Sequence, residues 1–359
     1  MRAALALARR GLGCVWPNPA VGCVLVGDGV VVGRGWTQAG GRPHAETEAL
    51  ARAGDLARGS SAYVTFEPCC HQGETPPCTE ALIEAGVARV VAAIVDPDPR
   101  VAGAGLARLR DAGLEVVSGV LEDEARALNA GFISAQTRAR PLVALKLAST
   151  LDGKIATRRG ESRWITGTAA RRRVHLLRAE YDAVMIGSGT ALADDPALTC
   201  RLAGLEDRSP VRVVVDGGLR LDPASALARS AGETPAWCLT GSGDAARTAA
   251  LTAHGVTVLK VAAGADGRVD LAAALEALAA RGITRLLVEG GAGLAAALIG
   301  TGLVDRLYWF RASALAGDDG LGALASLGVD RIEQLRRLVR TTIEPIADDL
   351  LETYTLPTL

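Results

Sequence analysis

Apolar positions recur along the chain with two alternating periods, one typical of strands and one typical of helices. The first 140 residues predict a short helix, a hairpin of two strands, and then helices that alternate with strands. The predicted helices cover residues 2–10, 44–53, 79–85, 105–112 and 121–135, and the predicted strands cover residues 21–26, 30–36, 62–66, 89–95 and 114–117. This alternation is typical of a layered α/β domain.

A second alternating pattern begins after a polar segment that ends in proline, residues 137–141. Such segments often separate domains, so we expect one domain over residues 1–140 and another over residues 141–359. The second pattern also predicts an α/β domain, with helices over residues 169–179, 244–253, 271–280 and from Leu294, and strands over residues 142–147, 183–186, 211–215, 236–239, 256–261, 286–288, 307–310, 338–343 and 350–355.

The composition narrows the classes of partner. Aromatic residues make up 3% of the 359 residues and the net charge is −1, so the composition indicates no surface for nucleic acid. No apolar stretch is long enough to span a membrane, and the first residues lack the long apolar core of a secretory leader. Seven cysteines, three of them within residues 69–78, favour a metal site in a reducing cytoplasm over a disulfide framework.

The strongest chemical signal joins a His-x-Glu motif to two later cysteines. His44 and Glu46 stand at the start of a predicted helix, and Cys69 follows Pro68 at the end of a predicted strand. Together with Cys78, the histidine and the first cysteine can supply three zinc ligands and leave the fourth tetrahedral position for water. This arrangement is typical of the zinc deaminases.

Hydrolytic deamination of a pyrimidine needs a strong nucleophile and a proton for the departing amine. Zinc supplies the first by lowering the pKa of its water to about 7. Glu46, on the first turn of the predicted helix, is placed to move the proton from the water to the ring and then to the amine. We therefore expect Glu46 to be the catalytic acid and base.

The spacing of the two cysteines leaves the ligand set open. Eight residues separate Cys69 from Cys78, whereas deaminases of this kind usually have a short Pro-Cys-x-x-Cys motif. Cys70 or His71 could therefore bind zinc in place of Cys69, or complete a closed and purely structural site. We favour Cys69 because it directly follows the strand, and because a structural zinc would leave Glu46 without a role.

Two glycine-containing segments of the second domain follow predicted strands, residues 186–190 and 289–293. Glycine lets a pyrophosphate approach the backbone, and a helix N-terminus offers its N–H groups to phosphate. Each segment alone is more often a turn, but two of them in one α/β domain indicate a phosphate-containing ligand. The second segment matches the Rossmann glycine pattern incompletely, because Ala296 stands at the position of the third glycine.

Several longer motifs occur along both predicted domains. They are PNPAVG (17–22), HAE (44–46), EPCCHQGETPPC (67–78), DPDP (96–99), VAG (101–103), KLASTLDGK (146–154), WIT (164–166), ADDPALT (193–199) and VEGG (288–291). Together they resemble the RibD family of bifunctional riboflavin-biosynthesis enzymes. The resemblance covers nearly the whole chain in the expected order. The long spacing between Cys69 and Cys78 is that family's own, so it supports the resemblance.

The resemblance implies a cytidine-deaminase-like three-layer αβα domain, followed by an α/β domain similar to dihydrofolate reductase. The first domain is expected to deaminate 2,5-diamino-6-(5-phosphoribosylamino)pyrimidin-4(3H)-one to 5-amino-6-(5-phosphoribosylamino)uracil. The second is expected to reduce the ribosyl group of that product to ribityl with NADPH. The family likeness also implies a homo-oligomer that forms through the reductase domains.

The resemblance also assigns residues by position. It makes His44, Cys69 and Cys78 the zinc ligands, makes Glu46 the proton donor, and brings Asn18 to the pyrimidine. It places the NADPH site at Ser149, Trp164, Thr190, Asp194, Gly291, Ala292, Gly293, Leu294, Ala295, Ala296 and Ala297. It places the reductase substrate site at Ser162, Arg178, Leu198, Arg201 and Glu289.

Some of these side chains have other readings. The guanidinium groups of Arg178 and Arg201 suit a substrate phosphate, although a solvated surface charge is the commoner fate of a single arginine. Trp164 could stack on a ring or fill the core. Three charged residues near the first strand of the second domain could orient the substrate: Lys146, Asp152 and Lys154.

Two positions depart from the family's pattern: Cys70 stands where Ser is usual, and ASALAG (312–317) replaces a Pro-Lys-Leu-like stretch. Two other functions would use the same motifs. One is a zinc nucleoside or tRNA deaminase with a non-catalytic C-terminal domain, which the low aromatic content does not favour. The other is an NADPH-binding or assembly protein with a structural zinc, which the presence of Glu46 does not favour.

Overall fold

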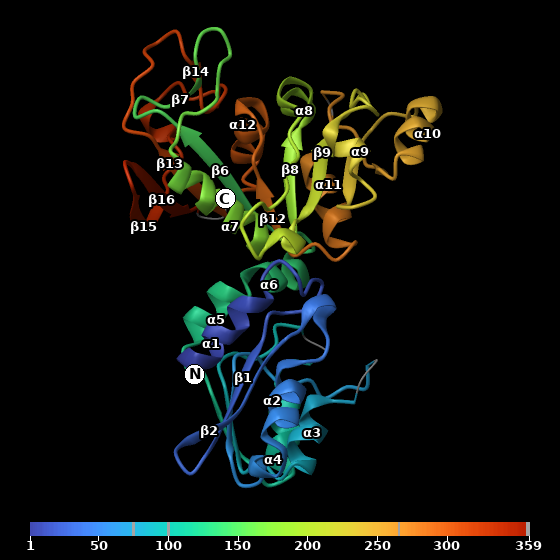
Figure 1. The fold of residues 1–359 in the computed structure, drawn as a ribbon, viewed down its shortest axis with the longest axis vertical. Helices are drawn as coiled ribbons and strands as arrows, with labels where there is room; N and C mark the ends of the chain where they lie inside the picture. The colour runs from blue at the N-terminus through green and yellow to red at the C-terminus, as the bar shows by residue number, and fades with distance from the viewer. Residues whose placement is uncertain (74–75, 99–100, 265, 357–359) are drawn as a thin grey trace. The chain divides into compact units, whose positions relative to one another are not determined.

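The computed structural model describes residues 1–73, 76–98, 101–264 and 266–356, and the chain divides into two compact units, Met1–Arg140 and Pro141–Leu359. Glu74, Thr75 and Pro99 of the motifs above lie outside the described residues. Each unit has its own sheet and its own core (Figure 1). In the described part of the chain, the helices are too short or too polar to cross a membrane.

A five-stranded sheet in the order β2-β1-β3-β4-β5 forms the middle of the first unit. β1 pairs antiparallel with both β2 and β3, whereas β3, β4 and β5 run parallel to one another. The predicted hairpin is therefore confirmed, with a turn between its two strands. The strands are β1 (Gly22–Gly27), β2 (Val30–Trp36), β3 (Ser61–Val64), β4 (Arg89–Ala92) and β5 (Glu115–Ser118).

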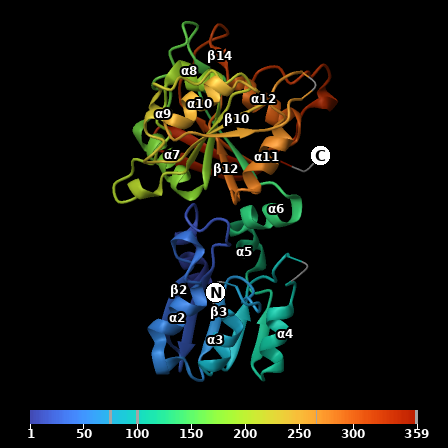
Figure 2. The same ribbon diagram turned by 90° about the vertical axis from the view of Figure 1, so that its right-hand side faces the viewer.

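Helices cover both faces of this sheet and give the unit three layers (Figures 1 and 2). One face carries α2 (Ala45–Ala53), α3 (Cys78–Glu84) and α4 (Ala104–Asp111), and the other carries α1 (Arg2–Ala8) and α5 (Glu122–Leu128). The three-layer αβα arrangement that the resemblance implied is therefore present. Short 3-10 helices cover Arg9–Gly11, Ala39–Gly41 and Gly54–Ala57.

The position of α2 depends on two glycines of β2. A Cβ atom at Gly35 would lie 2.1 Å from the carbonyl oxygen of Ala45, and one at Gly33 would lie 2.3 Å from that of Ala49. Only glycine lets the helix backbone approach the strand this closely. His44, the N-cap of α2, is thereby held at a fixed place against the hairpin.

The helix predicted over residues 121–135 is interrupted, so that α5 ends before α6 (Ala130–Arg138) begins. Asn129 stands at the break, with φ −95° and ψ 15°. Its Oδ1 accepts a hydrogen bond from the backbone N–H of Ala20 at 2.9 Å, and its Nδ2 donates to the carbonyl oxygen of Ala20 at 3.1 Å. Through these two bonds, Asn129 holds the backbone directly after the turn that contains Asn18.

The second unit is built on a nine-stranded sheet in the order β11-β10-β9-β8-β12-β6-β13-β16-β15. The strands from β11 to β13 are parallel, and β16 and β15 complete the sheet in antiparallel fashion. Its strands are β6 (Leu142–Ser149), β8 (Ala183–Gly187), β9 (Val211–Val215), β10 (Ala236–Thr240), β11 (Thr257–Lys260), β12 (Arg285–Val288), β13 (Arg306–Arg311), β15 (Val339–Ile346) and β16 (Asp349–Thr355).

The parallel strands are buried on both sides, as expected where helices flank a sheet. The helices are α7 (Thr168–Glu180), α8 (Ser188–Asp194), α9 (Ala226–Arg229), α10 (Ala245–Ala253), α11 (Leu271–Ala279) and α12 (Ala292–Gly300), with 3-10 helices at Glu206–Arg208 and Ile332–Gln334. The pattern did not predict α8, α9 or the small sheet of β7 (Lys154–Ala156) and β14 (Leu321–Gly322). Both units are α/β, which confirms the predicted fold class.

Candidate functional site

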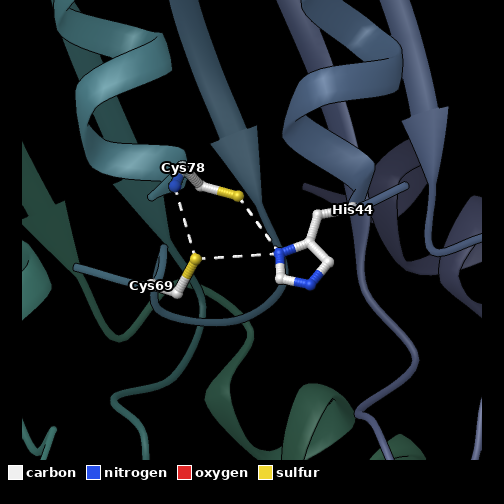
Figure 3. Close-up of side chains that lie close together, drawn as sticks. All are labelled: His44, Cys69 and Cys78. Carbon is white, nitrogen blue, oxygen red and sulfur yellow. Dashed lines mark hydrogen bonds between the residues drawn. The ribbon is translucent and has the colours of Figure 1, made fainter. Parts of the chain in front are cut away.

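The starts of two helices and one loop of the first unit bring together His44, Cys69 and Cys78 (Figure 3). His44 is the N-cap of α2, Cys78 is the first residue of α3, and Cys69 lies on the loop after β3. Glu46 lies on the first turn of α2 and is only 4% exposed.

The distances in this group fit a zinc ion. His44 Nδ1 lies 3.3 Å from Cys78 Sγ and 3.7 Å from Cys69 Sγ, and the imidazole ring directs this nitrogen at both sulfurs (Figure 3). Ligand atoms on one tetrahedral zinc lie about 3.6–3.8 Å apart when the Zn–N and Zn–S distances are ordinary. The backbone N–H of Cys78 also donates to Cys69 Sγ at 3.3 Å and so helps to orient it.

The structure distinguishes Cys69 from its neighbours. The metal-binding group found among the described residues contains Cys69 but neither Cys70 nor His71, and His71 is exposed. The geometry thus favours Cys69 as the ligand among the three candidates.

Proton affinities in this group are strongly perturbed. Hydrogen bonds from Cys78 lower the pKa of Cys69 to about 4, and the same contact raises the pKa of Cys78. Burial, together with the charge of Cys69, raises the pKa of Glu46 to about 7. The hydrogen bond to Cys69 raises the pKa of His44. One thiolate, one imidazole and a carboxyl group that can hold a proton therefore lie close together, with Glu46 and Cys78 buried and His44 and Cys69 half-buried.

Asn18 lies next to the loop that leads to His44. A Cβ atom at Gly41 would lie 1.9 Å from Asn18 Nδ2, so the amide packs against this glycine. Asn129, which fixes the same turn through Ala20, was not singled out by the sequence. No local pattern marks it, because its partner stands 109 residues earlier.

In the second unit, a cavity of about 1070 Å³ lies at the carboxyl ends of β8, β9 and β12. Gly187 and Gly291 are the N-caps of α8 and α12, so both glycine segments open helices rather than turns. The backbone N–H of Gly291 donates to Thr190 Oγ1 at 3.2 Å. Of the predicted cofactor residues, the cavity is lined by Thr190, Gly291, Ala292, Gly293, Leu294 and Ala297.

The other predicted cofactor residues are not part of this lining. Ser149 is buried at the end of β6, where its Oγ accepts a hydrogen bond from Trp309 Nε1 at 2.8 Å. Trp164 is 68% exposed, so it does not fill the core. The guanidinium of Arg171 lies over its ring, 4.5 Å from the ring centre. The rest lie at the exposed end of α8 or on the buried side of α12: Asp194, Ala295 and Ala296.

The cavity also has lining residues that the sequence did not indicate. They include Gly217, Gly218 and Arg220, which follow β9, and Arg268. Arg220 Nε lies 3.6 Å from Oδ1 of the buried Asp216, and Arg220 Nη2 donates a hydrogen bond to Ser188 Oγ. Gly217 and Gly218 follow a predicted strand, as do the two glycine segments identified from the sequence. The same sequence pattern could therefore have indicated this side of the cavity.

Two of the predicted substrate residues form an ion pair. Arg178 Nε and Nη2 donate to the carboxylate of Glu289 at 2.7 and 3.0 Å, and Arg178 Nη1 donates to the carbonyl oxygen of Thr199 at 3.0 Å. Burial opposes ionisation of Glu289, but Arg178 holds the pKa of this carboxyl below its usual value. A phosphate contact of Arg178 would compete with these bonds, so Arg178 fixes Glu289.

The remaining substrate candidates lie on neighbouring segments. Leu198 is buried with φ 56°, Arg201 is exposed, and Ser162 is half-buried before α7. Lys146 projects from β6, and burial lowers its pKa although Glu289 opposes the shift.

Asp152 and Lys154 have backbone partners at the end of the segment that departs from the family's pattern and just after it. Asp152 accepts hydrogen bonds from the backbone N–H groups of Ala316 and Gly317, and Lys154 Nζ donates to the carbonyl oxygen of Asp318 at 3.0 Å. These bonds anchor residues 316–318, and an orienting contact with the substrate stays a prediction.

Comparison with protein families gives a match for each unit. Residues 1–94 match the cytidine and deoxycytidylate deaminase zinc-binding region, and residues 141–351 match the RibD C-terminal domain. The riboflavin biosynthesis protein RibD of Escherichia coli (strain K12) is 41% identical over 367 residues, which cover 98% of this chain and 96% of that protein.

Solved structures agree. Acinetobacter baumannii RibD is 36% identical with a TM-score of 0.89, covering 99% of this chain and 97% of that one. A Thermotoga maritima deaminase/reductase, named for both pyrimidine activities, is 36% identical with a TM-score of 0.87 and the same coverage. The chain therefore belongs to the RibD family of bifunctional riboflavin-biosynthesis enzymes, with a deaminase domain followed by a reductase domain.

Proposed function

We propose that this enzyme carries out two successive steps on one phosphoribosylaminopyrimidine. Residues 1–140 deaminate 2,5-diamino-6-(5-phosphoribosylamino)pyrimidin-4(3H)-one to 5-amino-6-(5-phosphoribosylamino)uracil, and residues 141–359 reduce the ribosyl group of that product to ribityl with NADPH. The observation that carries the proposal is the group of His44, Cys69 and Cys78 beside Glu46, in a chain whose second unit matches a reductase domain. The same match does not favour a tRNA or nucleoside deaminase with a non-catalytic C-terminal domain.

In the deaminase unit, His44, Cys69 and Cys78 hold zinc, and the distances among their ligand atoms support this assignment. When bound, zinc lowers the pKa of its water, so that a nucleophile is available near neutral pH. Glu46 would take one proton from this water and pass it to a ring nitrogen as the hydroxide adds to the ring carbon, and would then pass the proton of the added hydroxyl to the amine as the carbon–nitrogen bond breaks. Its burial next to the ligands supports this role. Asn18 contacts the pyrimidine.

In the reductase unit, the cavity beside β8, β9 and β12 takes NADPH. The first N–H groups of α12 border the cavity and suit a pyrophosphate, and Thr190 bonds to the same segment. Arg220 and Arg268 are the cationic side chains of the lining, which also contains Asp266 and Asp270. The cofactor supplies the hydride, and the protein positions it against the substrate. By family likeness, the site extends to Ser149, Trp164 and Asp194.

The sugar phosphate to be reduced lies among Ser162, Arg178, Leu198, Arg201 and Glu289 in this proposal. Arg201 is exposed and suits the phosphate as a planar fork of donors. Arg178 holds the carboxylate of Glu289 in one orientation through two hydrogen bonds.

We also propose a cytoplasmic homo-oligomer that forms through the reductase domains. β15 is the edge of the nine-stranded sheet and is exposed over nearly all its length, including Val339 and Ile343. An exposed edge strand with apolar side chains can pair with another chain. The seven cysteines are free, which fits a reducing compartment.

The two halves of the proposal are tested separately. Zinc-loaded protein that is given the diaminopyrimidinone phosphate should release ammonia. Protein that is given the deaminated product should consume NADPH, which is measured as a fall in the absorbance of NADPH. Absence of ammonia would contradict the deaminase half, and an unchanged NADPH absorbance would contradict the reductase half.

A further inference from the structure

Glu67 is a buried carboxylate that the proposed chemistry does not use. It stands two residues before Cys69 and is 5% exposed. A buried charge is costly unless hydrogen bonds satisfy it. Four backbone N–H groups do so here: Oε2 accepts from Asp96 at 2.9 Å and Gly103 at 3.0 Å, and Oε1 accepts from Gly105 at 2.8 Å and Leu106 at 3.3 Å.

Three of these donors belong to the start of α4. Gly103 is its N-cap, and Gly105 and Leu106 lie in its first turn. The first N–H groups of a helix lack partners within the helix, and a negative charge at this end is favourable. Glu67 therefore caps α4 from a distant part of the chain, in place of a side chain at the N-cap itself.

The same junction is tightly packed. A Cβ atom at Gly105 would lie 2.1 Å from the carbonyl oxygen of Pro68, so α4 rests directly on the backbone before Cys69. On its other side, Cys69 receives two backbone N–H groups from α3, Thr79 N to its carbonyl oxygen at 3.1 Å and Cys78 N to its Sγ at 3.3 Å. The thiol is therefore held between the starts of two helices.

We propose that Glu67 is a positioning residue of the metal site. By anchoring residues 67–69 to the start of α4, it fixes Cys69 Sγ relative to His44 and Cys78. This inference rests on the proposed zinc ligands. Residues that orient metal ligands without touching the metal change its affinity about 10–100-fold when they are replaced.

Glu67→Gln is the direct test, because it keeps the size of the side chain but turns an NH2 group toward N–H donors. We expect its zinc affinity, measured by competition with a chromogenic chelator, to fall about 10-fold or more. The thiolate-to-metal absorption band of the cobalt-substituted protein should change as well, because Cys69 is displaced. Gly105→Ala disturbs the junction from α4 with Glu67 intact, and should also weaken zinc binding.

Two controls separate positioning from general stability. Glu80→Gln makes the same chemical change on α3 and removes a contact with α4, the exposed pair with Arg108 at 2.8 Å, without reaching Cys69. Leu109→Ala removes a fully buried side chain from α4 and destabilises the same unit. Both should keep the wild-type zinc affinity and cobalt spectrum.

Wild-type zinc affinity and spectrum in both Glu67→Gln and Gly105→Ala would overturn the inference. Equal losses in Glu67→Gln and Leu109→Ala would also overturn it, because they would show a merely structural role. Failure of the wild-type protein itself to bind zinc would instead contradict the proposed function, so the two failures are distinguishable.

Discussion

The guanidinium of Arg178 and the carboxylate of Glu289 form a two-bond pair that joins α7 to the end of β12. The two side chains are 11% and 8% exposed. Glu289 is the first residue of the glycine segment that leads into α12 and borders the cavity. The substrate region that we propose for the reductase unit therefore contains an ion pair that is already formed.

Arg178→Gln should destabilise the reductase unit, because Glu289 is left as a buried charge without this partner. Removing one member of a buried pair costs about 3–5 kcal/mol. Urea unfolding at neutral pH measures the loss. Arg158→Gln, which breaks an exposed pair with Asp319 in the same unit, should cost about 0–1 kcal/mol. If Arg178→Gln lowered the free energy of unfolding by as little as Arg158→Gln, the pair with Glu289 would not be needed for the stability of this unit.

Cys69→Ser should lose most of its bound zinc, whereas Cys70→Ser should keep it. The sulfur of Cys69 lies 3.7 Å from His44 Nδ1, and Cys70 is not part of the metal-binding group. Elemental analysis of the purified variants measures the zinc content. Loss of zinc from Cys70→Ser together with its retention in Cys69→Ser would reassign the ligand.

Asn129→Ala should raise the KM of the deaminase step and leave the reductase step unchanged. It removes both hydrogen bonds to Ala20 and loosens the turn that contains Asn18, at a cost of about 1–3 kcal/mol for the unsatisfied backbone groups. Thr137→Ala, which removes an exposed hydrogen bond on α6, is the matched control. Unchanged stability and KM in Asn129→Ala would count against a role in holding the turn.

Gly293→Val should raise the KM for NADPH without loss of stability. Gly293 lines the cavity, and a Cβ atom there meets no protein atom within 4 Å, so the new side chain enters the space that we propose for the cofactor. Gly232→Val makes the same change at an exposed glycine before β10, also with no protein atom within 4 Å of the added Cβ and outside the cavity lining. Equal KM values in the two variants would argue against NADPH in this cavity.

The sequence predicted features that depend on neighbouring residues. The hairpin follows from alternating apolar positions around a glycine turn, and the start of α2 and the His-x-Glu motif lie within a few residues of each other. The residues of the zinc group are far apart in the sequence, but His44 and Cys78 stand at helix starts, and Cys69 follows a proline in a recognisable motif after β3.

The features that the sequence missed depend on distant partners. The helix break at Asn129 needs Ala20, and the orientation of the Arg220 side chain needs Ser188. α8 was hidden because a segment with two glycines is typical of a turn, yet here Gly187 caps the helix that follows. Such contacts become visible only when the strands are assembled.

The central claim is that two separate chemistries reside in the two units, and Glu46→Gln tests it most directly. We measure ammonia release from the diaminopyrimidinone phosphate and NADPH consumption on the deaminated product, in protein shown to contain zinc. The variant should keep its zinc and its NADPH consumption but release ammonia about 10²–10⁴-fold more slowly than wild type. Ammonia release at the wild-type rate would contradict the account.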